Sequence, residues 1–193
     1  MSSIRNDESS VEERVLAAAA ACVLAVGVKR VTMTEIARRA RMSRPTIYRR
    51  WSDTNGVLGA LMTSRIAGVL DAIPGGGGRD REALVQRVVA VAEHLRNDDV
   101  VMSVLHDAPD FAMVYIAERL GTSQMILVDA LAQAISAAQA DGSVRQGDPQ
   151  QLAAMCLLIT QSTIQSAQMV EKLLDRDTLN AELARSLNGY LAP

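Results

Sequence analysis

The sequence predicts an all-α protein with a small three-helix head at its N-terminal side and a larger helical body behind it. Three observations support this prediction. Aromatic residues make up only 3% of the 193 residues, so Ala, Leu, Val, Ile and Met supply the core, and these favour packed helices over a β-sandwich. Apolar residues recur at helical spacing behind clear helix-start signals. No convincing strand and no internal repeat is visible.

The first predicted helix follows a polar segment, residues 1–9, which we expect to be a disordered arm. Ser10 and Glu13 have the spacing of a capping box, in which each side chain accepts from a backbone N–H of the other residue. An apolar stripe then continues to about Val26, and Gly27 suits the position just after a helix end. We therefore expect helix 1 to cover most of residues 10–26.

Two short helices are predicted next, at 33–40 and 44–51, separated by a turn at 41–43. Thr32 stands three residues before a glutamate and predicts a second capping box. Ser43 is a favourable N-cap for the other helix, and a proline follows in its first turn, where a missing N–H costs little. Together with helix 1 these helices make the three-helix head, residues 10–53.

The body, residues 54–193, begins with a longer helix capped by Ser52 or Asp53 and ending near Ile73. A proline and four glycines at 74–78 then form a flexible break, and they lack the lysine and hydroxyl residue of a phosphate-binding loop. The remaining helices are predicted at 79–96, 99–106, 108–120, 122–140, 149–174 and 177–190.

Charge is divided unevenly along the chain, although the net charge is only −2. Residues 1–53 carry ten basic and six acidic side chains, whereas residues 54–193 carry ten basic and sixteen acidic ones. Between residues 28 and 51 there are eight basic residues and one acidic residue. A basic head on an acidic body indicates a polyanionic partner at one end, although a solvated charged face is the commoner explanation for one charge cluster alone.

The helices at 33–40 and 44–51 have the spacing of a helix-turn-helix, whose second helix enters the DNA major groove. Arg44 can donate two hydrogen bonds to a guanine, and Thr46 can bond a base edge or contact a thymine methyl. Tyr48 and the following arginines suit phosphates, although each could instead be ordinary core or surface. The predicted DNA contacts are Thr32, Thr34, Arg44, Pro45, Thr46, Tyr48, Arg49, Arg50 and Thr54.

Residues 11–62 resemble the DNA-binding head of the tetracycline-repressor family of bacterial transcription regulators. The residues that carry this resemblance agree with the family pattern in register; they are Gly27, Val31-Thr32-Met33-Thr34, Ile36-Ala37-Arg38-Arg39-Ala40, Met42-Ser43 and Thr46-Ile47-Tyr48-Arg49-Arg50-Trp51. Trp51 replaces the family's usual phenylalanine, and Arg50 replaces its common histidine. Thr54-Asn55 replaces the usual Lys-Glu, which weakens the phosphate contact expected at the start of the fourth helix.

The resemblance implies a regulator that binds double-stranded DNA as a homodimer. The last two helices of each subunit would form a four-helix bundle that holds the dimer together, and a two-fold dimer would bind a palindromic operator. The sequence adds that the last helix has a leucine stripe and that residues 149–170 carry no charge, although packing within one chain would also explain both. The predicted dimer residues are Met155, Ile159, Leu179, Leu183 and Leu187.

The resemblance also implies a body that senses a small-molecule effector, so the function it suggests is a repressor released by a small apolar ligand. Methionine adapts to varied apolar ligands but is also a common core residue. The glutamines could give amide contacts to a ligand or bond across the dimer. The predicted pocket residues are Met62, Met102, His106, Phe111, Met113, Tyr115, Met125, Gln161 and Gln165.

Other classes of function find less support in the sequence. We predict no enzyme, no catalytic residue, no metal and no cofactor, because the two histidines, His94 and His106, form no cluster with metal-ligand spacing. The remaining alternative is a helical dimeric interaction module whose basic head binds an acidic protein instead of DNA.

A cytoplasmic location is expected for this chain. Cys22 and Cys156 lie far apart in apolar helical patterns, which indicates buried thiols in a reducing compartment. The first ten residues lack the apolar stretch of a secretion signal. The uncharged run 149–170 is long enough to span a bilayer, but its five glutamines make a membrane span unfavourable, so no membrane partner is predicted.

Overall fold

The computed structural model describes residues 2–73, 78–107 and 121–193, and every element of regular structure within these ranges is a helix. The chain divides into two compact units. The first unit contains the chain through Arg65 together with α6 (Asp99–Asp107), and the second contains Ile66–Asp98 and 121–193. The sequence places the boundary between head and body at residue 53, whereas the compact units divide further along, between Arg65 and Ile66.

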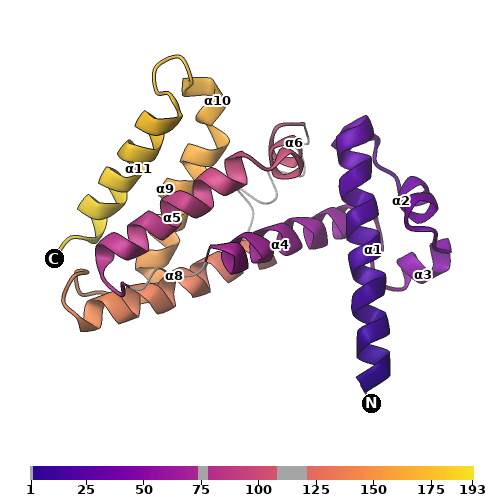
Figure 1. The fold of residues 1–193 in the computed structure, drawn as a ribbon, viewed down its shortest axis with the longest axis horizontal. Coiled ribbons are helices and arrows are strands. Elements are labelled where there is room, and N and C mark those ends of the chain that lie inside the picture. The colour runs from indigo at the N-terminus through magenta and orange to yellow at the C-terminus, as the bar shows by residue number, and fades with distance from the viewer. Residues whose placement is uncertain (1, 74–77, 108–120) are drawn as a thin grey trace. The chain divides into compact units, whose positions relative to one another are not determined.

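The first unit holds the predicted helix-turn-helix, with α2 and α3 beside α1 (Figure 1). Its core consists of side chains that are almost completely buried: Val15, Ala19, Cys22, Ile36, Ile47 and Val57. Its helices are α1 (Ser2–Val26), η1 (Val28–Arg30), α2 (Met33–Ala40), α3 (Arg44–Tyr48) and α6. The unit also contains the part of α4 (Thr54–Ala72) that precedes Ile66.

The start of α1 differs from the prediction. The helix begins at Ser2, so the expected disordered arm, residues 1–9, is helical from its second residue, and Ser10 lies inside the helix instead of capping it. Residues 2–26 contain neither glycine nor proline, so nothing in the sequence stops the helix from extending toward the N-terminus. The capping-box spacing at Ser10 therefore gave a wrong start.

The caps around the turn follow the sequence closely. The hydroxyl of Thr32 accepts from the backbone N–H of Glu35 at 3.2 Å, and the hydroxyl of Ser43 accepts from that of Thr46 at 3.4 Å. Asp53 caps α4 by accepting from the N–H of a glycine three residues later, at 2.8 Å. Both helices of the motif and the start of α4 therefore begin where the capping residues predict.

The second predicted helix of the motif is shorter than expected, because α3 ends at Tyr48 and not near Trp51. The chain from Arg49 to Trp51 stays in a hydrogen-bonded turn: the N–H groups of Arg50 and Trp51 both donate to the carbonyl of Ile47, at 2.9 and 3.0 Å. The carbonyl of Ile47 thus accepts two hydrogen bonds, one for each of its lone pairs.

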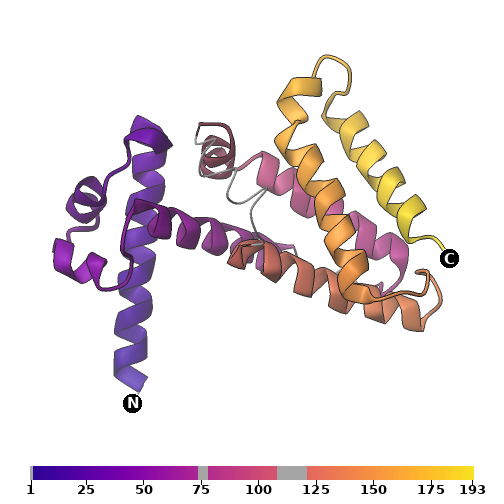
Figure 2. The ribbon, with the colours of Figure 1, turned by 180° about the vertical axis from the view of Figure 1, so that it is seen from behind.

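The second unit is a helical layer in which α9 packs against α5, α8 and α11 (Figure 2). The leucine stripe of the last helix faces the interior of this unit, because Leu179, Leu183, Leu187 and Leu191 are all buried within the chain. Its complete helices are α5 (Arg81–Arg96), α8 (Thr122–Ala140), α9 (Pro149–Gln165), α10 (Ala167–Val170) and α11 (Arg176–Leu191).

The single helix predicted at 149–174 is interrupted at Ser166, which separates α9 from α10. Hydroxyl groups just before this point bond the backbone of their own helix: Thr160 donates to the carbonyl of Cys156 at 2.8 Å, and Thr163 donates to that of Thr160 at 2.7 Å. Such bonds compete with the regular ladder and bend helices.

No helix in the described part of the chain combines the length and apolarity needed to cross a membrane.

Candidate nucleic-acid interface

The turn between α2 and α3 has a left-handed residue, Arg41, with φ of 54°. The N–H of Met42 donates to the carbonyl of Ala37 at 3.0 Å and closes the end of α2. Arg14 of α1 donates to the carbonyl of Ala40 at 2.8 Å, and so supplies a cation to a helix C-terminus. The geometry of the turn is therefore fixed partly from α1.

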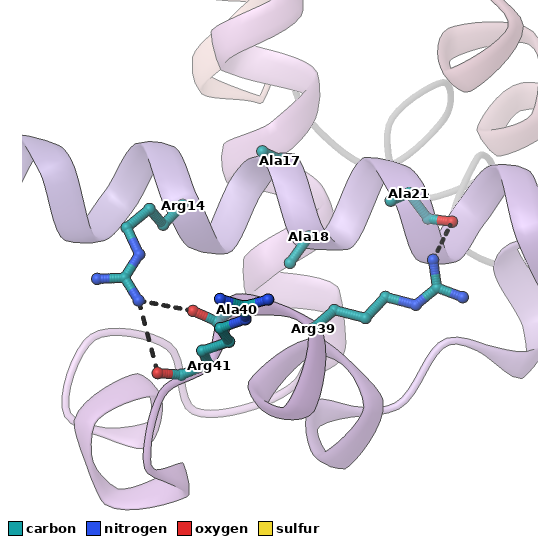
Figure 3. A pocket seen from close by; sticks show the side chains of 7 residues that line it. All are labelled: Arg14, Ala17, Ala18, Ala21, Arg39, Ala40 and Arg41. Carbon is teal, nitrogen blue, oxygen red and sulfur yellow. Dashed lines mark hydrogen bonds between the residues drawn. The ribbon is translucent and has the colours of Figure 1, made fainter.

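An open groove lies between α1 and α2 on the head, and Figure 3 shows how Arg14 and Arg39 reach across it. Arg39 reaches back from α2 to the carbonyl of Ala21 on α1, at 3.1 Å. Together with the bond from Arg14, this contact attaches α2 to α1 at two points. The groove is lined by Arg14, Ala17, Ala18, Ala21, Arg39, Ala40 and Arg41.

The helix α3 presents a polar, basic face above one buried anchor. Ile47 is 1% exposed and fixes the helix to the head, whereas Arg44 and Arg49 are exposed and Tyr48 is 50% exposed. Within the described residues, the side chains of Arg44 and Arg49 form no hydrogen bond and no ion pair. Both guanidinium groups are therefore available to a ligand outside the chain.

Arg50 lies in a different environment from its neighbours. Its guanidinium pairs with Glu12 of α1 at 2.8 Å and lies 5.8 Å from the ring centroid of Trp51. The sequence did not indicate the contact with Glu12, because 38 residues separate the two positions. Glu12 thus orients a cation that the sequence predicted as a phosphate contact.

The hydroxyl residues of the predicted site lie mainly at helix starts. Thr32 caps α2, and Thr34 is exposed in its first turn. Thr46 is half-buried, and its hydroxyl lies 2.7 Å from that of Ser43. Thr54 begins α4 and is half-buried. Pro45, which is exposed, occupies the first turn of α3, as its ring geometry favours.

A cluster of charged side chains on α2 centres on Glu35. Its carboxylate accepts from Arg38 at 2.6 Å and from Arg39 at 2.9 Å, and these hydrogen bonds, led by the one from Arg38, lower the pKa of Glu35 to about 2. The spacings of three and four residues make this cluster readable from the sequence. Because Arg39 also bonds Ala21, the carboxylate positions the arginine that joins α2 to α1.

Replacing Glu35 with glutamine should change how stability depends on pH. The folded pKa of Glu35 lies below the ordinary value of 4.5, so its stabilising effect is complete above that value and is lost as pH falls toward 2. We expect the melting temperature of Glu35→Gln to lie slightly below that of the unmodified chain at neutral pH and to converge with it below pH 4.5. Thermal melts followed by circular dichroism would measure this, and a constant difference at all pH values would contradict it.

The comparisons with known proteins agree with this geometry. The model of the bacterial regulatory proteins of the tetR family matches residues 15–61, which include the whole helix-turn-helix. An HTH-type transcriptional regulator of Mycobacterium bovis is 54% identical over 191 residues, which cover 99% of this chain and 100% of that protein. The chain belongs to the tetR family.

Solved structures of family members show the same fold at low identity. The Thermus thermophilus FadR structure has 22% identity and a TM-score of 0.68, with 93% of this chain and 92% of that chain covered. The Rhodococcus (R. erythropolis) repressor QsdR has 17% identity and a TM-score of 0.68, with 95% and 96% covered. These structures agree with the all-α fold, while the family match and the 54% identical relative make the chain a DNA-binding transcriptional regulator and leave the interaction module that binds only protein unsupported.

The predicted pocket residues of this tetR-family regulator are divided between the two units. Met62, half-buried Met102 and exposed His106 belong to the first unit. Exposed Met125 belongs to the second unit, together with half-buried residues Gln161 and Gln165. The amide of Gln161 accepts from Gln124 at 2.9 Å, which joins α9 to α8 within the chain. Three further candidates lie outside the described residues: Phe111, Met113 and Tyr115.

The predicted dimer residues fall into two groups. Leu179, Leu183 and Leu187 are buried inside the chain, so their side chains already have partners in the second unit. Met155 is 42% exposed and Ile159 is half-buried, both on α9. The sequence assigned these leucines to the dimer interface with packing within one chain as the alternative, and their burial in the single chain agrees with that alternative.

Proposed function

We propose that the chain is a homodimeric repressor that reads a palindromic operator through α3 and leaves it when a small apolar effector binds the body. The observation that carries this proposal is the free, exposed pair Arg44 and Arg49 above the buried Ile47. A rigid helix with unpaired cations on its outer face is what major-groove recognition requires. The repressor role is supported by FadR and QsdR, which are both repressors.

Arg44, the first residue of α3, is the proposed base reader, because bidentate donation to guanine O6 and N7 is the commonest specific contact. Thr46 adds a hydroxyl and a methyl one residue beyond the proline. Tyr48, Arg49 and Arg50 bind phosphates, which position α3 without reading sequence. The remaining proposed contacts lie at the starts of α2, α3 and α4: Thr32, Thr34, Pro45 and Thr54.

The proposed dimer face is the outer side of α9. Met155 and Leu158 are large apolar side chains that are 42% and 56% exposed in the single chain. Exposed Gln151 precedes them and exposed Ser162 follows, so these residues recur at spacings of four, three and four. Such spacing produces one continuous stripe along a helix and suits helix-on-helix packing. A two-fold dimer would place two copies of α3 about 34 Å apart or at a larger spacing.

The effector is proposed to be a small apolar or acyl-bearing molecule. The solved structure of Thermus thermophilus FadR is a complex with lauroyl-CoA, which supports an apolar ligand for a body of this fold. Release would follow if the effector binds better to the state of the dimer that does not fit the operator. We propose that residues 54–193 form this sensing and dimerising part, and that the regulator acts in the cytoplasm, where its operator is.

The test is a mobility-shift titration on a duplex from the region upstream of the chain's own gene, with a scrambled duplex beside it, at two salt concentrations. We expect preferential binding to the first duplex and a clear loss of affinity at higher salt, because phosphate contacts release counterions. Tyr48→Ala should weaken binding to both duplexes at unchanged helicity. Arg185→Ala, on the exposed side of α11, is the matched control and should bind normally.

Lauroyl-CoA is then added to the specific complex as the first effector probe. Release of the duplex by lauroyl-CoA, but not by free coenzyme A, would support an acyl-bearing effector. Absence of DNA binding at low salt by a folded dimer would refute the proposed function.

A further inference from the structure

Several arginines of the second unit end on acceptors that suit them. Arg87 donates to backbone carbonyls at the C-terminal end of α4, at 2.9 and 3.3 Å. Arg145 donates to the carbonyl of Tyr190 near the end of α11, at 2.9 Å, and its guanidinium lies over that residue's ring. These contacts are typical of cations at helix C-termini. The hydrogen-bond partners of Arg96 differ from those of Arg87 and Arg145.

Arg96, the last residue of α5, lacks an equivalent set of acceptors. Its Nη2 donates to the amide oxygen of Asn180 on α11, but its Nη1 is buried and has no hydrogen-bond partner. Within the described part of the chain, no other buried side-chain nitrogen or oxygen is left without a partner. Buried polar groups are nearly always bonded, and leaving a charged donor unpaired is costly. An acceptor is therefore missing beside Arg96.

A second guanidinium lies close to the first. Arg176, the first residue of α11, donates through Nη2 to the amide oxygen of Asn97 at 2.6 Å. Burial lowers the pKa of Arg96, the charge of Glu93 opposes that shift, and the charge of Arg176 lowers the pKa further. Arg176 thus bonds the residue that follows Arg96, which places a second guanidinium group at the same end of α5. Among the described residues, no carboxylate lies within ion-pairing distance of either guanidinium.

We propose that Arg96, Arg176, Asn97 and Asn180 form a binding site for a small oxyanion, a phosphate or carboxylate group, where α5 ends and α11 begins. Guanidinium groups bind these anions through paired N–H donors, and Arg96 Nη1 is a donor that has no partner within the described part of the chain. Both asparagine oxygens accept from the arginines, which leaves their NH₂ groups to donate to the anion. The partial positive charge at the start of α11 also favours a bound anion.

Nearby acidic groups limit what the site can take. Glu93 is close enough to act on Arg96, and Asp175 caps α11 by accepting from the N–H of Thr178 at 2.8 Å. Two cations beside these carboxylates favour a single small oxyanion over an extended polyanion. The site is made entirely of residues of the second unit and includes none of the proposed DNA contacts, so its test does not depend on them.

The experiment is a set of thermal melts of the full chain in chloride, inorganic phosphate or acetate at equal ionic strength. About 10 mM phosphate should raise the melting temperature by about 3 °C if it binds with a millimolar dissociation constant. Arg176→Gln and Arg96→Met should lose this rise. Arg185→Gln is the control, because Arg185 is an exposed cation on the same helix, paired with Glu182. It should keep the full rise.

The two anions distinguish the sources of the ligand group. A rise with phosphate alone indicates a phosphate-bearing ligand, and an equal rise with acetate indicates a carboxylate. Arg96→Met could unfold the chain, so far-UV circular dichroism in chloride is recorded first, and Arg176→Gln carries the test if helicity is lost. An equal rise in all four proteins would mean a general salt effect and would overturn the proposal. No rise in the unmodified chain would overturn it as well.

Discussion

Replacing Arg44 with alanine should remove most of the preference for operator over scrambled DNA while leaving the fold intact. Arg44 is exposed at the start of α3 and has no partner among the described residues, so its truncation removes no contact within the chain. A bidentate contact to guanine discriminates by about 1–3 kcal/mol, which corresponds to about 5–150-fold in relative affinity. Competition titrations of the two duplexes would measure this ratio directly.

Arg49→Ala is the matched variant for that experiment. Arg49 is also exposed and carries the same charge, but we assign it to a phosphate. Its loss should weaken binding to both duplexes by a similar factor and reduce the salt dependence by about one counterion. If Arg44→Ala and Arg49→Ala behaved alike, Arg44 would be a phosphate contact and the proposed reading of bases would be wrong.

Leu158→Glu should mainly affect assembly, whereas Leu183→Ala should mainly affect stability. Leu158 is 56% exposed on α9, so a glutamate there should dissociate the dimer and leave the fold of the isolated chain almost unchanged. Leu183 is 1% exposed inside the second unit, so truncation leaves a cavity and should lower the free energy of unfolding by about 2–5 kcal/mol. Sedimentation velocity would report assembly, and denaturant unfolding of each variant and of the unmodified chain, at one fixed protein concentration, would report stability.

The same pair tests the assignment of the dimer face. A monomeric Leu158→Glu variant should also bind the palindromic duplex weakly, because only one half-site can be engaged at a time. If Leu158→Glu stayed dimeric at low protein concentration, the outer face of α9 would not be the interface. If Leu183→Ala dissociated the dimer with no loss of stability, the leucine stripe would have to contact the partner subunit.

Local signals in the sequence predicted most of the head. Thr32, Ser43 and Asp53 cap the helices that they were expected to cap, because a capping bond depends only on residues within one turn. The same reasoning failed at Ser10, where a favourable capping spacing lies inside a helix that nothing interrupts. An N-cap residue can set the start of a helix only where the residues before it resist helix formation.

Contacts between distant segments could not be predicted from periodicity. The pairing of Glu12 with Arg50 and the position of Arg96 near Arg176 depend on how helices meet, and no short spacing encodes either. Burial of Leu183 and exposure of Leu158 are equally hidden, because both belong to apolar helical stripes. Pattern identifies which side of a helix is apolar, while packing decides what covers it.

The left-handed turn residue has a consequence for engineering this regulator. A non-glycine residue in that conformation costs about 1–2 kcal/mol, and at Arg41 the neighbouring contacts compensate, including the bond from Arg14 of α1 to Ala40. The motif from α2 to α3 therefore cannot be transferred to another protein without α1. A chimeric regulator that borrows this recognition helix must also borrow α1 from Arg14 onward, or the transplanted turn will relax and the helix will lose its orientation.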